Sequence, residues 1–140
     1  MSAPAGAGPG KPLGKYPLAK RVGDLVFVSG TTARLADGGV AGVTRQPDGT
    51  VHRDVAVQTR TVIQHIEKIL GTLGCTLADC VDITVFLTDM RDFAAYNQVY
   101  GEYFDQDGPT RTTVAVSGLP HPDMVVELKA IALAPRAAAA

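Results

Sequence analysis

The sequence predicts an α+β domain in which two helices pack on one face of a mixed β-sheet. Three observations lead to this fold class: two stretches carry apolar residues at helical spacing, several short runs have the composition of strands, and the segments follow one another as β, β, α, β, α, β, β. A length of 140 residues with 46% hydrophobic residues suits one domain with a two-layer core. We expect parallel strand pairs at the helical crossovers, because each helix links two strands of one sheet.

The first half of the chain predicts two strands and a long helix. Residues 24–30 (DLVFVSG) form a β-rich run that ends at glycine. A second, short strand is predicted at 40–43, between two Asp-Gly turn signals. Apolar residues then recur on one helical face from Val55 to Leu73, and Gly74 stands where a C-terminal cap is expected.

The second half predicts a strand, a helix and two further strands. Residues 81–88 (VDITVFLT) alternate between apolar and polar positions, which is typical of a strand with one buried face. Asp89 is predicted to cap the second helix, with Asp92 in place of the glutamate of a capping box, and Gly108-Pro109 to end it. The last two strands are predicted at 111–117 and 124–133.

The chain ends differ in composition from the rest of the chain. Residues 1–13 are mostly Ala, Gly and Pro and are expected to form a flexible arm, residues 14–135 a single domain, and residues 136–140 a tail. No apolar run has a membrane-spanning length and no signal-peptide stretch begins the chain, so a cytoplasmic protein with no membrane partner is expected.

Charge and metal-ligating residues exclude several classes of function. The formal net charge of -1 argues against a nucleic-acid partner, because such proteins neutralise phosphates with clustered Lys and Arg. Cys75 and Cys80 are too few for a disulfide framework, and their spacing matches no common zinc site. The histidines are scattered, so no metal site is expected.

One arginine and one glutamate in the last two strands form the first candidate site. If these strands form a hairpin about the SGLPHP turn, Arg111 faces Glu127 on the sheet surface away from the helices. The pair is then either a solvated cross-strand salt bridge or a functional site. In the second case, Arg111 would hold a substrate carboxylate by two hydrogen bonds and Glu127 would position or deprotonate a water molecule. Such a site suits the hydrolysis of a small carboxylate-bearing substrate.

The predicted sheet face away from the helices carries several uncharged residues. They are Thr113, Ala115, Val125, Ile131 and Leu133. An exposed patch of this kind on a small domain indicates self-association. A site at Arg111 could then lie between subunits.

Longer stretches of the sequence resemble a known family. They are Gly14-Lys15-Tyr16, DLVFVSG (24–30), VDITVFLTDMRDFAAYNQVYGEYF (81–104), GPTRTTVAV (108–116) and LPHPDMVVELKAIALAP (119–135). Together they are similar to the Rid (YjgF) family of imine and enamine deaminases over Gly14 to Pro135. KYPLAKRVGDLVFVSGTTAR, GPTRTTVAV and LPHP look most similar to the 2-aminomuconate deaminase branch.

The resemblance implies a homotrimer whose sheets surround a central barrel, with active sites in clefts between subunits. The arginine that matches Arg111 binds the substrate carboxylate, and the acid that matches Glu127 positions the attacking water. Tyr16, Ser29 and Gly30 match residues that line the same pocket. No metal or organic cofactor is implied.

Two positions depart from the best-known bacterial members. Thr113 stands where those members carry a cysteine, so thiol chemistry is not expected, although Thr113 is still expected to line the substrate pocket. The turn between the last two strands is one residue longer, which leaves the reach of His121 open.

The implied reaction is the conversion of 2-aminomuconate to 4-oxalocrotonate plus ammonia. Because this substrate has two carboxylates, a second cation should reach the cleft, and we favour Arg34, which closely follows the pocket-lining VSG segment. The other candidates are Lys15, Lys20, Arg21 and His121. Three alternatives stay open: a general 2-aminoacrylate-type deaminase, a non-enzymatic trimer that binds a small molecule or a protein, and an endoribonuclease, which the net charge disfavours.

Overall fold

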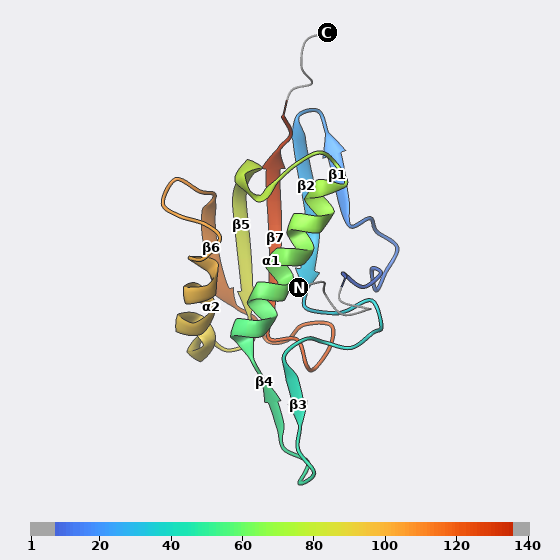
Figure 1. The fold of residues 1–140 in the computed structure, drawn as a ribbon, viewed down its shortest axis with the longest axis vertical. Coiled ribbons are helices and arrows are strands. Elements are labelled where there is room, and N and C mark those ends of the chain that lie inside the picture. The colour runs from blue at the N-terminus through green and yellow to red at the C-terminus, as the bar shows by residue number, and fades with distance from the viewer. Residues whose placement is uncertain (1–7, 136–140) are drawn as a thin grey trace.

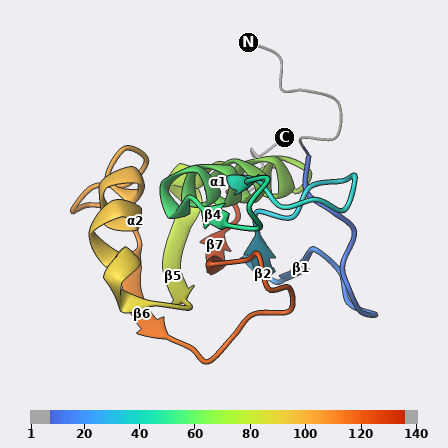
Figure 2. The same ribbon diagram turned by 90° about the horizontal axis from the view of Figure 1, so that it is seen from below.

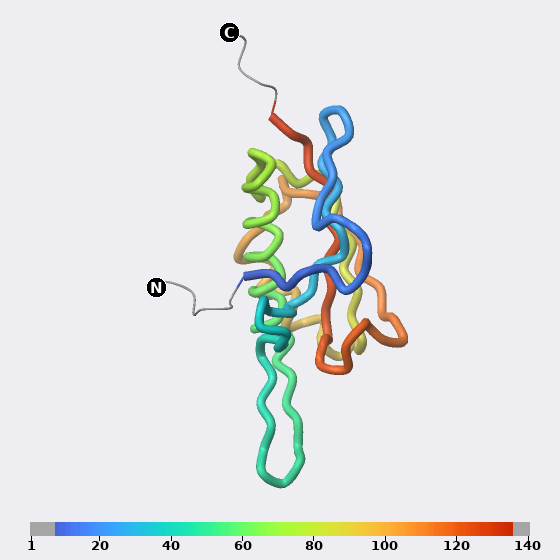
Figure 3. The backbone as a smooth tube through the Cα atoms, turned by 90° about the vertical axis from the view of Figure 1, so that its right-hand side faces the viewer, coloured from blue at the N-terminus to red at the C-terminus, as the bar shows by residue number. Residues whose placement is uncertain are grey.

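The computed structural model describes residues 8–135, which form a mixed five-stranded sheet with two helices on one face (Figures 1 and 2). The α+β fold class predicted from the sequence is confirmed. A separate two-stranded hairpin projects from the body (Figure 3). In chain order the elements are β1 (Ala19–Val22), β2 (Leu25–Thr32), β3 (Val43–Arg45), β4 (Val51–Arg53), α1 (Val55–Gly71), β5 (Cys80–Leu87), α2 (Phe93–Tyr100), β6 (Thr110–Ala115) and β7 (Val126–Leu133). The predicted tail and residues 1–7 of the predicted arm lie outside the described residues.

Helix α1 packs its buried apolar face against the sheet and forms one side of the core. The side chain of Asp54 accepts a hydrogen bond from the Val57 amide at 3.1 Å, which starts the helix as an N-cap. Val62 and Ile66 are almost fully buried, as the helical spacing predicts. Gly74 has φ of +74°, and the Cys75 amide beyond it returns to the Leu70 carbonyl at 3.0 Å.

The strand order corrects the prediction of a hairpin between the last two strands. The order is β1-β2-β7-β5-β6, so β5 lies between β6 and β7. β6 is parallel to β5, as expected for the α2 crossover, and β7 is antiparallel to both β5 and β2. The central place suits β7 because Val126, Leu128 and Ala130 are fully buried beneath the helices. Strands β2 and β5 therefore run in the same direction without being neighbours.

The N-terminal half contains three strands that the sequence pattern did not predict: β1, β3 and β4. β1 carries Ala-Lys-Arg-Val on an edge of the sheet, where exposed charged residues hide the strand pattern. The strand predicted at 40–43 is wrong: Val40 makes only an isolated bridge with Arg34, and the chain instead forms the hairpin β3–β4. This hairpin closes around Gly49, whose φ of +90° only glycine adopts readily.

The second helix is shorter than predicted. Asp89 accepts a hydrogen bond from the Arg91 amide at 2.9 Å, but it caps a 3-10 turn at Met90–Asp92 that precedes α2. α2 ends at Tyr100 rather than at Gly108-Pro109, because the amides of a turn that follows directly donate to the last carbonyls of the helix, those of Asn97, Val99 and Tyr100.

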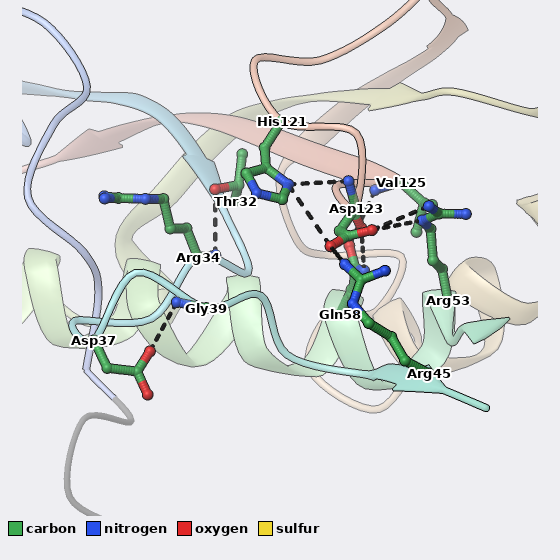
Figure 4. Close-up of polar contacts among 10 residues, drawn as sticks. All are labelled: Thr32, Arg34, Asp37, Gly39, Arg45, Arg53, Gln58, His121, Asp123 and Val125. Carbon is green, nitrogen blue, oxygen red and sulfur yellow. Dashed lines mark hydrogen bonds and ion pairs between the residues drawn. The ribbon is translucent and has the colours of Figure 1, made fainter. Parts of the chain in front are cut away.

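A buried aspartate joins the projecting hairpin to the segment before β7 (Figure 4). The carboxylate of Asp123 pairs with Arg45 of β3 and Arg53 of β4. Gln58 of α1 donates to the Asp123 carbonyl at 2.8 Å and accepts from the Val125 amide at 3.0 Å. The network fixes the chain at Asp123 and Val125, directly before β7, and so fixes where that strand enters the sheet.

We expect the variant R45A/R53A to lose about 3–5 kcal/mol of unfolding free energy in urea denaturation, because it leaves the Asp123 carboxylate buried without a counter-charge. Adding Asp123→Asn should restore part of that loss by removing the charge. Arg60→Ala is the control: Arg60 pairs with Glu102 on the surface, and its removal should cost about 0–1 kcal/mol. Equal losses in R45A/R53A and R60A would contradict this account.

Candidate active site

The side chain of Glu127 lies at a solvent-open hollow of about 510 Å³. It alternates with the buried Val126 and Leu128, so it projects on the open face, which is the sheet face opposite the helices. Three other predicted site residues line the same hollow: Tyr16, Gly30 and Arg34. The structure therefore brings four of the predicted residues together.

The carboxylate of Glu127 is half-buried and makes no hydrogen bond or ion pair with any residue from 8 to 135. Burial raises its pKa above the usual value of a glutamate. A carboxylate with unused acceptor oxygens and a raised pKa is suited to accept a proton from water. No cation among the described residues forms an ion pair with this carboxylate, so the group keeps its basicity.

Gly30 makes room for this carboxylate. The register of β2 against β7 shifts between Val28 and Thr31, and Gly30 lies within that irregularity. A Cβ atom at position 30 would collide with Oε1 of Glu127. A side chain here would therefore displace the carboxylate.

Gly30→Ala is expected to lower catalytic activity at least tenfold, because the carboxylate must move by more than an ångström and small misplacements of reacting groups are costly. The matched control is Gly118→Ala, since a Cβ at Gly118 meets no atom within 4 Å. Both variants should fold, as judged by circular dichroism. Activity close to wild type in G30A would show that the position of Glu127 is not critical.

Arg111 of β6 lies beneath α2, on the helix face of the sheet. Its guanidinium is 4.7 Å from the ring centroid of Tyr100 and 5.4 Å from that of Tyr96. Nη1 donates to Oδ1 of Asn97 at 2.7 Å. No carboxylate among the described residues forms an ion pair with this arginine, which leaves it able to bind an anion.

The phenol of Tyr100, which Arg111 contacts, stays neutral. The hydroxyl of Tyr100 is buried without a hydrogen-bond partner in the described chain, and burial raises the pKa of Tyr100 to about 12. The guanidinium of Arg111 therefore contacts a neutral phenol at Tyr100.

The expected contact between Arg111 and Glu127 does not exist within one chain. Arg111 pairs with Ile83 of β5, while Glu127 pairs with Phe86 on the other side of that strand. Two strand spacings and three residue steps separate them, which is about 14 Å between Cα atoms. Their side chains also point to opposite faces. The predicted cross-strand pair is wrong because β5 occupies the place assigned to a hairpin partner.

The remaining predicted residues have mainly structural contacts. The hydroxyl of Ser29 donates to the Pro17 carbonyl at 2.8 Å, and Ser29 is not among the residues lining the hollow. The Thr113 hydroxyl bonds with the Tyr96 hydroxyl under α2, so Thr113 does not lie on the open face as predicted. Ile131 and Leu133 of the predicted patch do lie on the open face.

Sequence reasoning missed the surroundings of Arg111. The aromatic residues at Phe93, Tyr96 and Tyr100 have helical spacing, which indicates a packing face equally well. Asn97 lies between them and gives no signal of its own. A long-range contact with β6 was needed to show that this helix face supports an arginine.

Two further classes of feature are absent from the described residues. Within residues 8–135, no group of three or more His, Cys, Asp or Glu side chains is placed to hold a metal ion. Neither described helix has the length and apolar content needed to cross a bilayer.

Comparison with known proteins gives consistent matches over nearly the whole chain. Residues 8–134 match a family model described as Endoribonuclease L-PSP. The chain is 39% identical over 122 residues to a RutC family protein of Pyrococcus abyssi, covering 87% of this chain and 88% of the relative. It is 36% identical over 121 residues to the 3-aminoacrylate deaminase RutC of Acinetobacter baylyi, covering 86% and 88%. The fold matches a crystal structure of Escherichia coli TdcF with bound serine at a TM-score of 0.73 and 32% identity, covering 92% and 94%.

Proposed function

This chain belongs to the Rid (YjgF) family, and from that premise we propose that it is a hydrolytic deaminase of small enamines or imines that carry a carboxylate. The observation that carries the proposal is the half-buried, unpartnered Glu127 at a solvent-open hollow. The name of the Acinetobacter relative and the serine bound to TdcF support a small carboxylate-bearing substrate.

The proposed reaction is the hydrolysis of a C=N bond. An enamine first tautomerises to the imine. Glu127 takes a proton from a water molecule while the water oxygen bonds to the imine carbon and the C=N electron pair moves to nitrogen. The nitrogen gains this proton, which gives a carbinolamine. The hydroxyl proton of the carbinolamine then passes to the amino nitrogen as the C–N bond breaks, so that ammonia leaves and a carbonyl remains. Arg111 holds the substrate carboxylate and contributes positioning rather than bond-making.

We propose that each site combines residues of two copies of the chain, in a homotrimer around a central barrel. Two features support this: Arg111 and Glu127 face opposite sides of one sheet, and Val114 and Leu133 leave apolar surface exposed. Sedimentation equilibrium should give a mass three times the 14.6 kDa of one chain. A monomeric species with full activity would exclude a shared site.

The finer proposal concerns the substrate. We propose 2-aminomuconate, converted to 4-oxalocrotonate and ammonia, with a general 2-aminoacrylate-type deaminase as the alternative. The test is ammonia release from both compounds, each generated in situ, by wild type and R111A. A preference for 2-aminomuconate that depends on Arg111 supports the 2-aminomuconate proposal. A preference for 2-aminoacrylate supports the general deaminase. Turnover of neither would favour a non-enzymatic trimer that binds a small molecule or a protein.

An RNA substrate fits this chain less well, although the family model carries the word endoribonuclease. Binding along an RNA backbone needs clustered cations, and the net charge is -1. RNA cleavage that persists in E127Q would be due to another site or a contaminant.

A further inference from the structure

The hollow around Glu127 is lined by two cations, Arg34 and Lys11. Nη1 of Arg34 donates to the Lys11 carbonyl at 2.9 Å, which uses one of the five N–H groups of a guanidinium. Neither Arg34 nor Lys11 forms an ion pair with a carboxylate in the described part of the chain. No ion pair within residues 8–135 therefore engages either cation at the hollow.

The backbone holds Arg34 in place beside the hollow. The Gly10 amide donates to the Arg34 carbonyl at 3.1 Å, and the Ala36 amide donates to the Gly8 carbonyl at 3.1 Å. Pro9 and Leu35 form a bridge between the same two segments. Figure 4 shows the Arg34 side chain extending away from the Asp123 network. The guanidinium is thus positioned at the hollow rather than engaged in the nearby ion pairs.

Gly10 also brings the backbone close to this guanidinium. A Cβ atom at position 10 would lie 2.7 Å from Nη1 of Arg34. A larger residue would therefore push the guanidinium out of its place. The position of the charge depends on this close approach.

The two arginines make different demands on a substrate. Arg111, supplied by a neighbouring copy in the proposed trimer, satisfies one carboxylate. Arg34 then provides a second cation on the Glu127 side of the same cleft, and a monocarboxylate would leave it unused. An arginine fork matches a carboxylate by two parallel hydrogen bonds.

We propose that Arg34 binds a second carboxylate, so that the substrate class is a dicarboxylate enamine or imine with the reacting carbon between two cations. This inference rests on the proposed function, because it places both carboxylates in one deaminase site. Lys11 adds positive charge without the geometry for two parallel hydrogen bonds.

The test compares two stable probes that differ at one end only. Muconate carries a carboxylate at both ends of a six-carbon diene, and sorbate carries one. Calorimetry should show muconate binding at least tenfold more tightly than sorbate to wild type. Arg34→Ala should weaken the binding of muconate about tenfold to a hundredfold, the range expected for charge-assisted hydrogen bonds, and leave the binding of sorbate unchanged. Gly10→Ala keeps the charge of Arg34 but displaces its guanidinium, so this variant should also bind muconate more weakly than wild type.

Arg21→Ala is the matched control, because Arg21 is also an exposed arginine that donates to one backbone carbonyl, that of Gly23. The inference would be overturned if R34A lost equal affinity for muconate and sorbate. It would also be overturned if R21A lost as much affinity for muconate as R34A does. Ammonia release by wild type is measured separately. Muconate selectivity that depends on Arg34 without any turnover would refute the deaminase proposal alone, whereas turnover with no such selectivity would refute the role of Arg34 alone.

Discussion

Arg111→Ala is expected to lower kcat/KM for an enamine carboxylate by about 10²–10⁴. The substrate would lose two charge-assisted hydrogen bonds, each worth about 1.5–3 kcal/mol, and every 1.4 kcal/mol corresponds to about tenfold. Arg111→Lys should restore little, because an ammonium lacks the planar fork that matches a carboxylate. Steady-state ammonia release measures both variants.

The control for Arg111 is Arg91→Ala. Arg91 is exposed and pairs only with Asp89 two residues away, so its loss should leave kcat/KM unchanged. The folded state of R111A should remain intact, because Arg111 is only partly buried. Activity of R111A within twofold of wild type would remove Arg111 from the site.

Glu127→Gln is expected to lower kcat by about 10²–10⁴, the range for removal of a general base. The amide keeps the size of the carboxylate, so the effect reports the lost proton acceptor rather than a cavity. The same change should raise the melting temperature at neutral pH, because it removes a charge that burial disfavours. A variant that is both less active and more stable is typical of a residue kept for function.

The pH dependence has a definite sign. Burial raises the pKa of Glu127 in the folded chain above its value in the unfolded chain, so the folded state binds more protons between the two values. The contribution of Glu127 to the unfolding free energy, taken relative to neutral pH, is fully present below its unfolded-state pKa. This contribution is lost as the pH rises through the folded-state pKa. The stability difference between E127Q and wild type should therefore shrink in acid. The activity of wild type should fall as pH drops through the same raised pKa.

Mixing the two inactive variants tests whether the site is shared. In mixed trimers of R111A and E127Q, a site becomes complete where an intact Arg111 meets an intact Glu127 from the neighbouring copy. Random assembly from equal amounts predicts recovery at about a quarter of the sites. Unfolding and refolding the two chains together, followed by an ammonia assay, measures this. Chains refolded separately and then mixed without exchange are the control, and no recovery in the co-refolded sample would place both residues in one chain's site.

The elements that depend on neighbours in sequence could be predicted from the sequence. Helix α1 was expected from the spacing of Val62 and Ile66, because a helical face repeats every 3.6 residues whatever it packs against. Strand β5 was expected from its alternation, and Asp89 as a cap was placed correctly, although it caps a 3-10 turn. Edge strand β1 was missed because solvent on both sides removes the alternation that reveals a strand.

The sequence by itself determined the fold class, the family and the residues to examine, since these depend on local periodicity and on motifs such as GPTRTTVAV. Only the tertiary structure decided how those residues relate in space. Strand β5 lies between β6 and β7 and so separates Arg111 from Glu127, and the strand registers turn their side chains to opposite faces. Residues 8–12 and 34–36 meet beside the hollow. Strand order depends on which buried surfaces pack best across the whole chain, and no local pattern records that choice.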